Sequence, residues 1–440
     1  MKKTIVLFLI FLLITFIFII NIHDIRSFAK KRLSERTKEI VKEVIFGKDR
    51  MKQIKDLQKY KYMNYNVKLL PETQFLKLNF EELYLKNLGN NKGNANNYKA
   101  ASGHELNSFF LEQYKDQILI TTSTGNFFSL NKKHLKDLVN PKFIKINSNL
   151  NNNKINILDN LVLKDEIFIS YSKFKSEKCY FINILKSKID NKKLVFENFF
   201  KSEKCQQDYG GGKLALYSHE DKNGLLLTVD VFGGSLIDAD SRFQAENIAQ
   251  LDEFIFGKIL FIDFASKNYE IFSKGHRTPQ GLIVDKDIIL STEHGPRGGD
   301  EINLIAKGNN YGWPIASYGE PYYWQKKKQM DDYDYFKSHW ENEFIEPIYS
   351  FVPSIGISQI IKVPKNFSKE WSNNFLVTSL NGGSIYRILF DKFFSKVVYT
   401  EKIYIGKRIR DILYVKDFNI FLVALENNGG SIGILSKYID

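Results

Sequence analysis

At 440 residues the chain is long enough for two or three domains, and its 36 Phe and 23 Tyr favour a β-rich core. The formal net charge is +13. Lys and Asn are spread along the whole chain with acidic residues between them, which indicates a lysine-rich solvated surface and argues against a nucleic-acid partner.

The first 22 residues predict a targeting element. Lys2 and Lys3 precede an apolar run from Ile5 to Ile20, and this run approaches the length needed to span a bilayer. The small residues of a signal-peptide cleavage site do not follow the run. We therefore expect a signal anchor or transmembrane helix at 1–22, with the rest of the chain membrane-anchored and extracytoplasmic, on the periplasmic side.

Residues 23–65 predict a helical stalk or linker, because apolar residues recur there at roughly helical spacing among charges. We assign residues 66–440 to one large domain. Its first part is strand-like only in places and includes an Asn/Gly-rich loop. Two cysteines, Cys179 and Cys205, fit an exported protein with one disulfide, and two unpaired buried thiols are the alternative.

From about residue 106 the chain becomes a series of short strands with a recurring unit. The unit is an apolar strand, a Ser/Thr/Ala-containing end, a glycine turn and a second strand. Examples are ILITTSTGNFFSL, IILSTEHGPRGGDEINLI, FLVTSLNGGSIYRI and FLVALENNGGSIGIL. Such a repeat without helical segments between the strands predicts a β-propeller, although it does not count the blades.

Residues 275–314 hold the densest group of chemically special side chains, in the sequence GHRTPQGLIVDKDIILSTEHGPRGGDEINLIAKGNNYGWP. Two apolar runs flank the polar residues 285–287, which predicts a hairpin with a polar cluster at its strand ends. Glycine and proline in these clusters let backbone carbonyls face a ligand, and carbonyls beside carboxylates suit a hard cation such as calcium. A turn that merely connects strands is the alternative.

This stretch resembles the signature of the glucose/sorbosone dehydrogenase family, which are soluble sugar dehydrogenases that use pyrroloquinoline quinone (PQQ). The resemblance implies an all-β, six-bladed β-propeller. It also implies PQQ- and calcium-dependent oxidation of an aldose sugar or related alcohol, with electrons passing to a membrane or periplasmic acceptor.

The resemblance assigns metal-binding groups within this stretch. Main-chain oxygens of Gly295 and Pro296 match those that hold the calcium ion beside the quinone. Asp300 and Glu301 match an acidic pair that holds a second, structural cation.

Cofactor contacts are assigned in the same way. Arg277, Thr278 and Gln280 match residues that contact PQQ, with threonine where the family has asparagine. Arg408 and Arg410 match a second element, and their alternation along a strand points both guanidiniums in one direction, which suits the carboxylates of PQQ.

Two departures from the family pattern concern the chemistry. Asn381 stands where the family often has a lysine that contacts PQQ. Tyr209 stands where the family has its catalytic histidine, with Asp208 as the candidate in a register shifted by one residue. Lys213 replaces an arginine nearby, and its charge or that of calcium would lower the pKa of a tyrosine base. These departures keep open a second function, a catalytically degenerate propeller that binds a glycan or another ligand without redox turnover.

Overall fold

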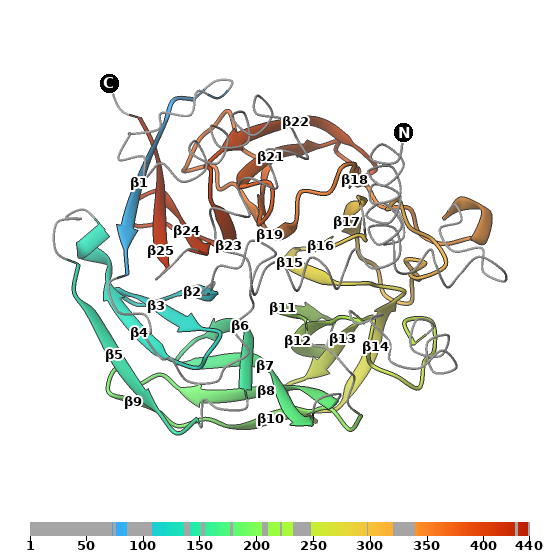
Figure 1. Ribbon diagram of the computed structural model, residues 1–440, viewed down its shortest axis with the longest axis horizontal. Coiled ribbons are helices and arrows are strands. Elements are labelled where there is room, and N and C mark those ends of the chain that lie inside the picture. Colours follow the sequence, from blue (N-terminus) through green and yellow to red (C-terminus); the bar gives the residue numbers. More distant parts are fainter. Residues whose placement is uncertain are drawn as a thin grey trace, which may run out of the picture. The chain divides into compact units, whose positions relative to one another are not determined.

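Six β-sheets stand around a common centre in the computed structural model, and each is one blade of a β-propeller (Figure 1). The inner strand of each blade contacts the inner strand of the next blade, which closes the ring. Neighbouring strands within each four-stranded blade pair antiparallel, while the first blade gains a fifth, parallel strand. The predicted all-β, six-bladed propeller is therefore confirmed.

The blades contain the following strands, each blade written from its inner strand outward. They are blade 1, β2 (Phe109–Tyr114), β3 (Gln117–Thr122), β4 (Phe127–Asn131), β5 (Phe143–Ser148) and β9 (Lys193–Leu194); blade 2, β6 (Ile155–Leu163), β7 (Glu166–Ser176), β8 (Cys179–Lys188) and β10 (Glu197–Lys201); blade 3, β11 (Gly211–His219), β12 (Lys222–Val229), β13 (Lys258–Asp263) and β14 (Tyr269–Lys274); blade 4, β15 (Pro279–Asp285), β16 (Ile288–Glu293), β17 (Asp300–Leu304) and β18 (Tyr349–Phe351); blade 5, β19 (Ile357–Lys362), β20 (Phe375–Ser379), β21 (Ser384–Phe390) and β22 (Val397–Tyr404); blade 6, β23 (Arg408–Val415), β24 (Ile420–Glu426), β25 (Ser431–Lys437) and β1 (Leu78–Tyr84). Two short 3-10 helices, η1 (Lys132–Leu135) and η3 (Trp340–Asn342), complete the described elements.

The structure describes residue 73 and residues 76–85, 108–135, 141–150, 155–176, 179–204, 210–220, 222–231, 248–296, 298–319, 339–426 and 430–438. The predicted anchor at 1–22 and the predicted stalk at 23–65 lie outside these ranges. Within them, no helix is long and apolar enough to cross a membrane. The predicted disulfide also falls outside, because Cys205 and the side chain of Cys179 are not described.

Blade 6 combines strands from the two ends of the described chain. The N-terminal strand β1 pairs antiparallel with the C-terminal strand β25, from Leu78 opposite Lys437 to Tyr84 opposite Ser431. This pairing joins the two ends of the described chain and makes β1 the outer strand of the last blade. A local sequence pattern gives no sign of it.

The middle strands are buried on both faces because each blade packs against its two neighbours. Strand β24, IFLVALE, is buried along its whole length. Phe421 and Val423 pack in the core shared with blade 5, whereas Leu422 and Ala424 pack in the core shared with blade 1. This double burial explains why the repeat has continuous apolar runs rather than strict alternation.

The hairpin predicted between the two polar clusters forms as β15 and β16. Asp285 pairs with Ile288, and Lys286 in the turn has a φ of 57°. Antiparallel pairing then brings Pro279 opposite Glu293, so both clusters lie at the same end of blade 4.

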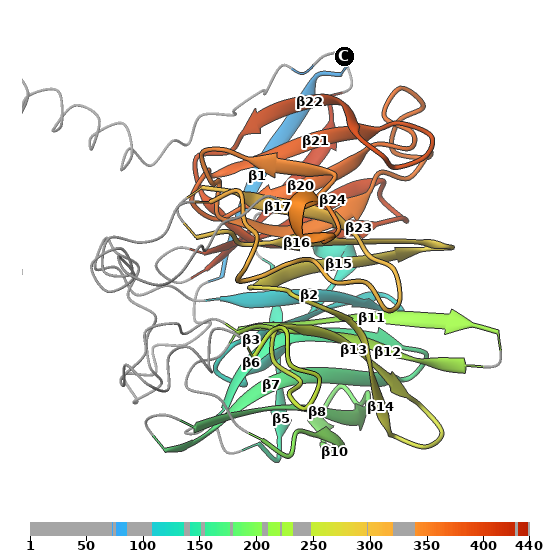
Figure 2. The ribbon, with the colours of Figure 1, turned by 90° about the vertical axis from the view of Figure 1, so that its right-hand side faces the viewer.

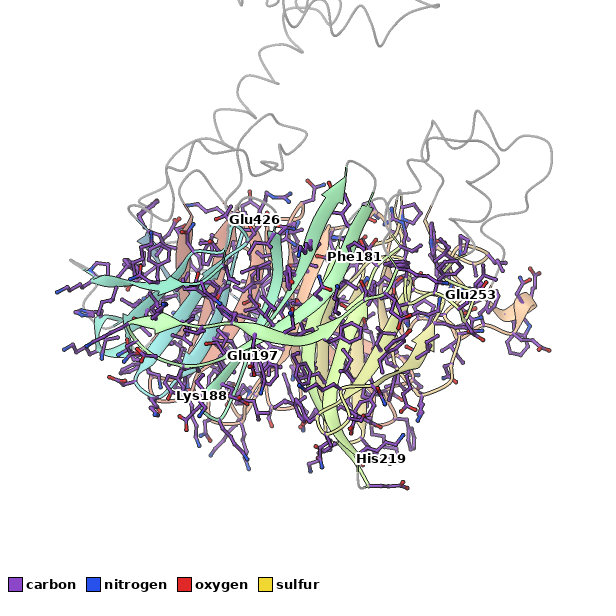
Figure 3. The ribbon with its side chains drawn as sticks, turned by 90° about the horizontal axis from the view of Figure 1, so that it is seen from below. Phe181, Lys188, Glu197, His219, Glu253 and Glu426 are labelled. Atoms are coloured by element: carbon purple, nitrogen blue, oxygen red, sulfur yellow. The ribbon has the colours of Figure 1, made fainter. Side chains whose placement is uncertain are left out.

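The strands of the propeller run between its two faces (Figure 2). We call the end at which the inner strands β2, β6, β11, β15, β19 and β23 begin the site face. Glu426, Phe181 and Glu253 lie at this face, and Lys188 and His219 lie at the opposite one (Figure 3).

Candidate functional site

The two arginines of the C-terminal motif lie side by side at the site face, as predicted, and share one carboxylate. Arg408 Nε donates to Glu426 Oε2 at 3.0 Å, and Arg410 Nε donates to Glu426 Oε1 at 2.6 Å. Arg410 Nη1 also donates to Gln280 Oε1 at 3.1 Å. Blades 4 and 6 thus bring three of the predicted cofactor contacts together, although 130 residues separate Gln280 from Arg410.

Glu426 balances only one of the two positive charges. Burial alone would raise the pKa of Glu426, but the charges of Arg410 and Arg408 outweigh it and lower this pKa to about 2. Ser108 also donates a hydrogen bond to this carboxylate. The Arg408 and Arg410 side chains stay 27% and 20% exposed, respectively, so the cluster offers a net positive charge to a ligand at the site face.

The side chain of Arg277 holds the loop that follows β16. Its Nη1 donates to the carbonyl oxygens of His294 at 2.9 Å and Gly295 at 3.0 Å, and its guanidinium lies 5.3 Å from the centre of the Trp313 ring. Gly295 O, a predicted calcium ligand, therefore already accepts a hydrogen bond. A carbonyl oxygen has two lone pairs, so a cation bound there would share this oxygen with a guanidinium.

A buried chain of polar side chains fixes the backbone of Arg277. The Arg277 N–H donates to the Glu293 carboxylate, which also hydrogen-bonds His276 Nδ1 at 3.0 Å. His276 Nε2 hydrogen-bonds Ser273 Oγ at 2.8 Å, and its ring stacks on Tyr311. This Ser–His–Glu arrangement is buried, with exposures of 1%, 0% and 3%, so no substrate reaches the serine and its role is to position Arg277.

The two acidic residues at the start of β17 have different surroundings, because neighbouring residues of a strand point to opposite faces. Asp300 accepts hydrogen bonds from the N–H groups of Gly295 at 3.1 Å, Ile355 at 3.0 Å and Ile357 at 2.9 Å. Burial would raise the pKa of Asp300, but the hydrogen bond and charge of His294 help to hold it below its ordinary value. Asp300 therefore connects the loops before β17 and β19.

Glu301 lies directly opposite Glu293 in the β16–β17 pair. Burial, and then the charge of Glu293, raises the pKa of Glu301 well above its ordinary value. The predicted acidic pair is thus divided between two environments. Among the described residues no group of three or more His, Cys, Asp or Glu side chains is arranged to hold a metal ion.

Two further predicted residues lie at the site face. Thr278 is buried, and its Oγ1 has no hydrogen-bond partner within the described part of the chain. An unpaired buried hydroxyl indicates a missing acceptor or donor, as expected beside a ligand. Asn381 is exposed in the turn between β20 and β21, at the same end of the propeller.

Lys213 points into a group of carboxylates contributed by the inner strands. Its Nζ donates to Asp159 Oδ1 at 2.9 Å and lies 4.0 Å from Asp411 Oδ1. Burial raises the pKa of the nearby Glu112 to about 8, against the opposing charge of Lys213. The ammonium of Lys213, which was expected to lower the pKa of a base at Tyr209, is therefore already paired with these carboxylates.

The candidate base residues Asp208 and Tyr209 lie outside the described residues, but their neighbour Gly210 is placed. A Cβ atom on Gly210 would lie only 2.1 Å from Asp230 Oδ2, so the buried Asp230 carboxylate lies directly against this backbone. Three acidic residues of the site face carry no motif in the sequence, namely Asp230, Glu293 and Glu426. Each is a single acidic residue at a strand end, and Glu293 could have been found because it directly precedes the HGP element.

Comparison with known proteins identifies relatives of the chain. A family model described as Glucose / Sorbosone dehydrogenase matches residues 115–434. The aldose sugar dehydrogenase YliI of Escherichia coli is 29% identical over 188 residues, which cover 38% of this chain and 44% of that protein. Quinoprotein glucose dehydrogenase B of Acinetobacter calcoaceticus is 29% identical over 207 residues, which cover 36% of this chain and 43% of that protein. The matched segments thus span less than half of these curated relatives.

Solved structures share the fold. The apo form of the soluble aldose sugar dehydrogenase of Escherichia coli superposes with a TM-score of 0.59 at 19% identity, covering 82% of this chain and 100% of that one. The PQQ-bound aldose sugar dehydrogenase of Streptomyces coelicolor superposes with a TM-score of 0.55 at 14% identity, covering 84% of this chain and 100% of that one. At these identities the likeness concerns the fold.

Proposed function

Because the chain belongs to the glucose/sorbosone dehydrogenase family, we propose that it is a PQQ-dependent dehydrogenase of an aldose sugar or a related alcohol. The observation that carries this proposal is the cationic cluster at the site face. Two partly exposed arginines share one buried glutamate and reach Gln280 of another blade. The relatives named as an aldose sugar dehydrogenase and a quinoprotein glucose dehydrogenase support the same reaction class.

The residues at the site face fit the chemistry of PQQ, a tricarboxylic acid. Arg408 and Arg410 would bind its carboxylates, with Gln280 and Thr278 as further hydrogen-bonding groups, and the unpaired hydroxyl of Thr278 is consistent with a ligand beside it. When bound, PQQ supplies the acceptor for the two electrons that leave the sugar. We propose calcium as the second component, bound by the main-chain oxygens of Gly295 and Pro296, because carbonyl oxygens suit this ion.

Oxidation of a sugar hydroxyl also needs a group that takes the hydroxyl proton while hydride leaves the same carbon. We place this group at Tyr209 or Asp208, by their position in the family motif. An isolated tyrosine has a pKa of about 10 and is a weak base near neutrality. The carboxylate of Asp230, which is buried, lies against the backbone of Gly210, the residue that follows this position.

The cellular setting is part of the proposal. The apolar run at 1–22 supports a membrane-tethered, extracytoplasmic enzyme that passes electrons to a membrane or periplasmic acceptor. Protease treatment of intact cells and of cells with a permeabilised outer membrane tests this. The propeller should be cleaved only after the outer membrane is opened, and protection under that condition would place it in the cytoplasm.

A dye-coupled oxidation assay tests the proposed reaction. Full-length protein in detergent is loaded with PQQ and calcium and offered a panel of aldoses and alcohols. Arg410→Ala should lower the apparent PQQ affinity by roughly tenfold to a hundredfold, as expected for one lost charge-assisted hydrogen-bonding group. Lys402→Ala, which removes an exposed lysine from β22, is the control and should behave like wild type. A wild-type protein that oxidises no sugar in this panel would refute the dehydrogenase function.

The second candidate function is ligand binding without turnover. Asn381 and Tyr209 favour it, because the family has a lysine and a histidine at these positions. A glycan array probed with the PQQ-free protein distinguishes the two functions: specific glycan binding in a protein that shows no oxidation supports the second one.

A further inference from the structure

Lys258, the first residue of β13, is a fully buried lysine outside the site described above. Its ammonium donates hydrogen bonds to three backbone carbonyls, those of Ile248 at 2.9 Å, Ala249 at 2.9 Å and Phe256 at 3.0 Å. An ammonium has three N–H groups, so its hydrogen-bonding capacity is used completely. Within the described ranges no carboxylate forms an ion pair with it. Proteins hold hard cations with carbonyl oxygens in a similar way.

Burial opposes the charged form of Lys258, which its three carbonyl acceptors favour. Burial lowers the pKa of this lysine to about 7, so the apolar surroundings disfavour the ammonium. A methionine of similar length would fill the same space without this cost. The presence of a lysine here is therefore better explained by its hydrogen bonds to three carbonyls of one loop than by packing.

The loop that these acceptors belong to, residues 248–257, supports the segment that precedes the cofactor-contacting arginine. Ala249 O accepts a hydrogen bond from the Gly275 N–H at 3.1 Å, and Gly257 O accepts one from the His276 N–H at 3.1 Å. The fit is close, since a Cβ atom on Gly257 would lie 2.8 Å from the His276 carbonyl oxygen.

The same loop also holds the backbone of Trp313, whose ring lies beside that arginine. Gln250 Nε2 donates to Trp313 O at 2.6 Å, and Gln250 Oε1 accepts from Asn310 Nδ2 at 2.6 Å. The Trp313 ring lies 5.3 Å from the Arg277 guanidinium. The backbone of the two residues before Arg277 and the backbone of its ring neighbour Trp313 are therefore hydrogen-bonded to the loop that surrounds one ammonium.

We propose that Lys258 is a positioning residue, an internal cation that shapes the 248–257 loop and thereby places Arg277 for its ligand. That this ligand is PQQ rests on the proposed function. The placement of Arg277 does not, and it can be measured in the protein without cofactor.

Hydrogen–deuterium exchange of the cofactor-free, full-length protein measures this placement. Lys258→Met should raise the exchange of the amides at 274–278, together with those of the loop, by about tenfold or more, because three hydrogen bonds that hold the loop are lost. PQQ affinity should fall by roughly tenfold to a hundredfold, as is typical when a supporting group behind a site is removed. Lys132→Met is the matched control, since Lys132 is also buried but pairs with Asp417 in a distant blade. It should leave the 274–278 amides and PQQ affinity unchanged.

Chemical rescue separates the ammonium from packing. Lys258→Ala removes four side-chain atoms, and propylammonium present during refolding supplies three carbons and the ammonium again. It should restore slow exchange at 274–278, whereas 1-propanol, of the same size but uncharged, should not. Equal rescue by the alcohol would overturn the proposal.

Two further outcomes would overturn the proposal. The first is normal exchange at 274–278 in a Lys258→Met protein whose 248–257 loop exchanges faster. The second is a failure of both variants to fold even with propylammonium, because Lys258 would then support the whole blade. A wild-type protein that does not bind PQQ would refute the proposed function and leave the exchange result to decide the role of Lys258.

Discussion

Replacement of Glu426 by glutamine is the sharpest test of the cationic cluster. The folded-state pKa of Glu426 is about 2, against an ordinary value of 4.5, because Arg408 and Arg410 stabilise its charged form. This difference between the folded and the ordinary pKa corresponds to about 3 kcal/mol of folding free energy. Since the folded pKa is depressed, this stability is fully present above pH 4.5 and is lost as the pH falls toward 2. Glu426→Gln should therefore lower the free energy of unfolding by about 3 kcal/mol at pH 7.

Urea denaturation of wild type and Glu426→Gln at pH 7, 4 and 2.5 provides the assay. The difference in unfolding free energy should shrink as the pH falls below 4.5, because Glu426 of the unfolded wild type then takes up a proton while the folded protein binds it only near pH 2. A difference that stays constant from pH 7 to pH 2.5, or a variant as stable as wild type at pH 7, would refute the reasoning.

Three further substitutions test other parts of the account. Asp300→Ala should lower the free energy of unfolding by about 3 kcal/mol, since it leaves three backbone N–H groups without their acceptor. An unchanged thermal midpoint of unfolding would argue against the role of Asp300 in connecting the loops. Lys213→Met should lower the free energy of unfolding by about 3–5 kcal/mol, as measured by urea denaturation, because it leaves Asp159 without its ion pair in the interior. An unchanged free energy of unfolding would mean that the carboxylates around Lys213 are protonated. Tyr209→His should raise dye-coupled turnover by about a hundredfold, the effect of a general base with a pKa near neutrality, and an unchanged rate would exclude Tyr209 as the position of the base.

The propeller could be predicted because its repeat is local. Each unit carries its own strands and turn, and the hairpin at 279–293 is specified by a polar interruption between two apolar runs. Closure of blade 6 could not be predicted, since the pairing of Leu78 with Lys437 joins the two ends of the described chain and has no local pattern.

The site shows the same limit. Arg408 and Arg410 were found because they alternate within one motif, whereas Glu426, which both contact, is a lone glutamate at the end of a different strand. The division of Asp300 from Glu301 was predictable, because neighbours along a strand point to opposite faces. Lys258 has no sequence signal, since its partners are backbone carbonyls that only the folded loop brings together.

Calorimetric titration of the full-length protein with PQQ in the presence of calcium tests the central claim most directly. We predict calcium-dependent binding in the micromolar range or tighter, and a loss of this binding when both Arg408 and Arg410 are replaced by alanine. Absence of binding by the wild type, or binding that survives the double replacement, would show that the cationic cluster at the site face is not a PQQ site.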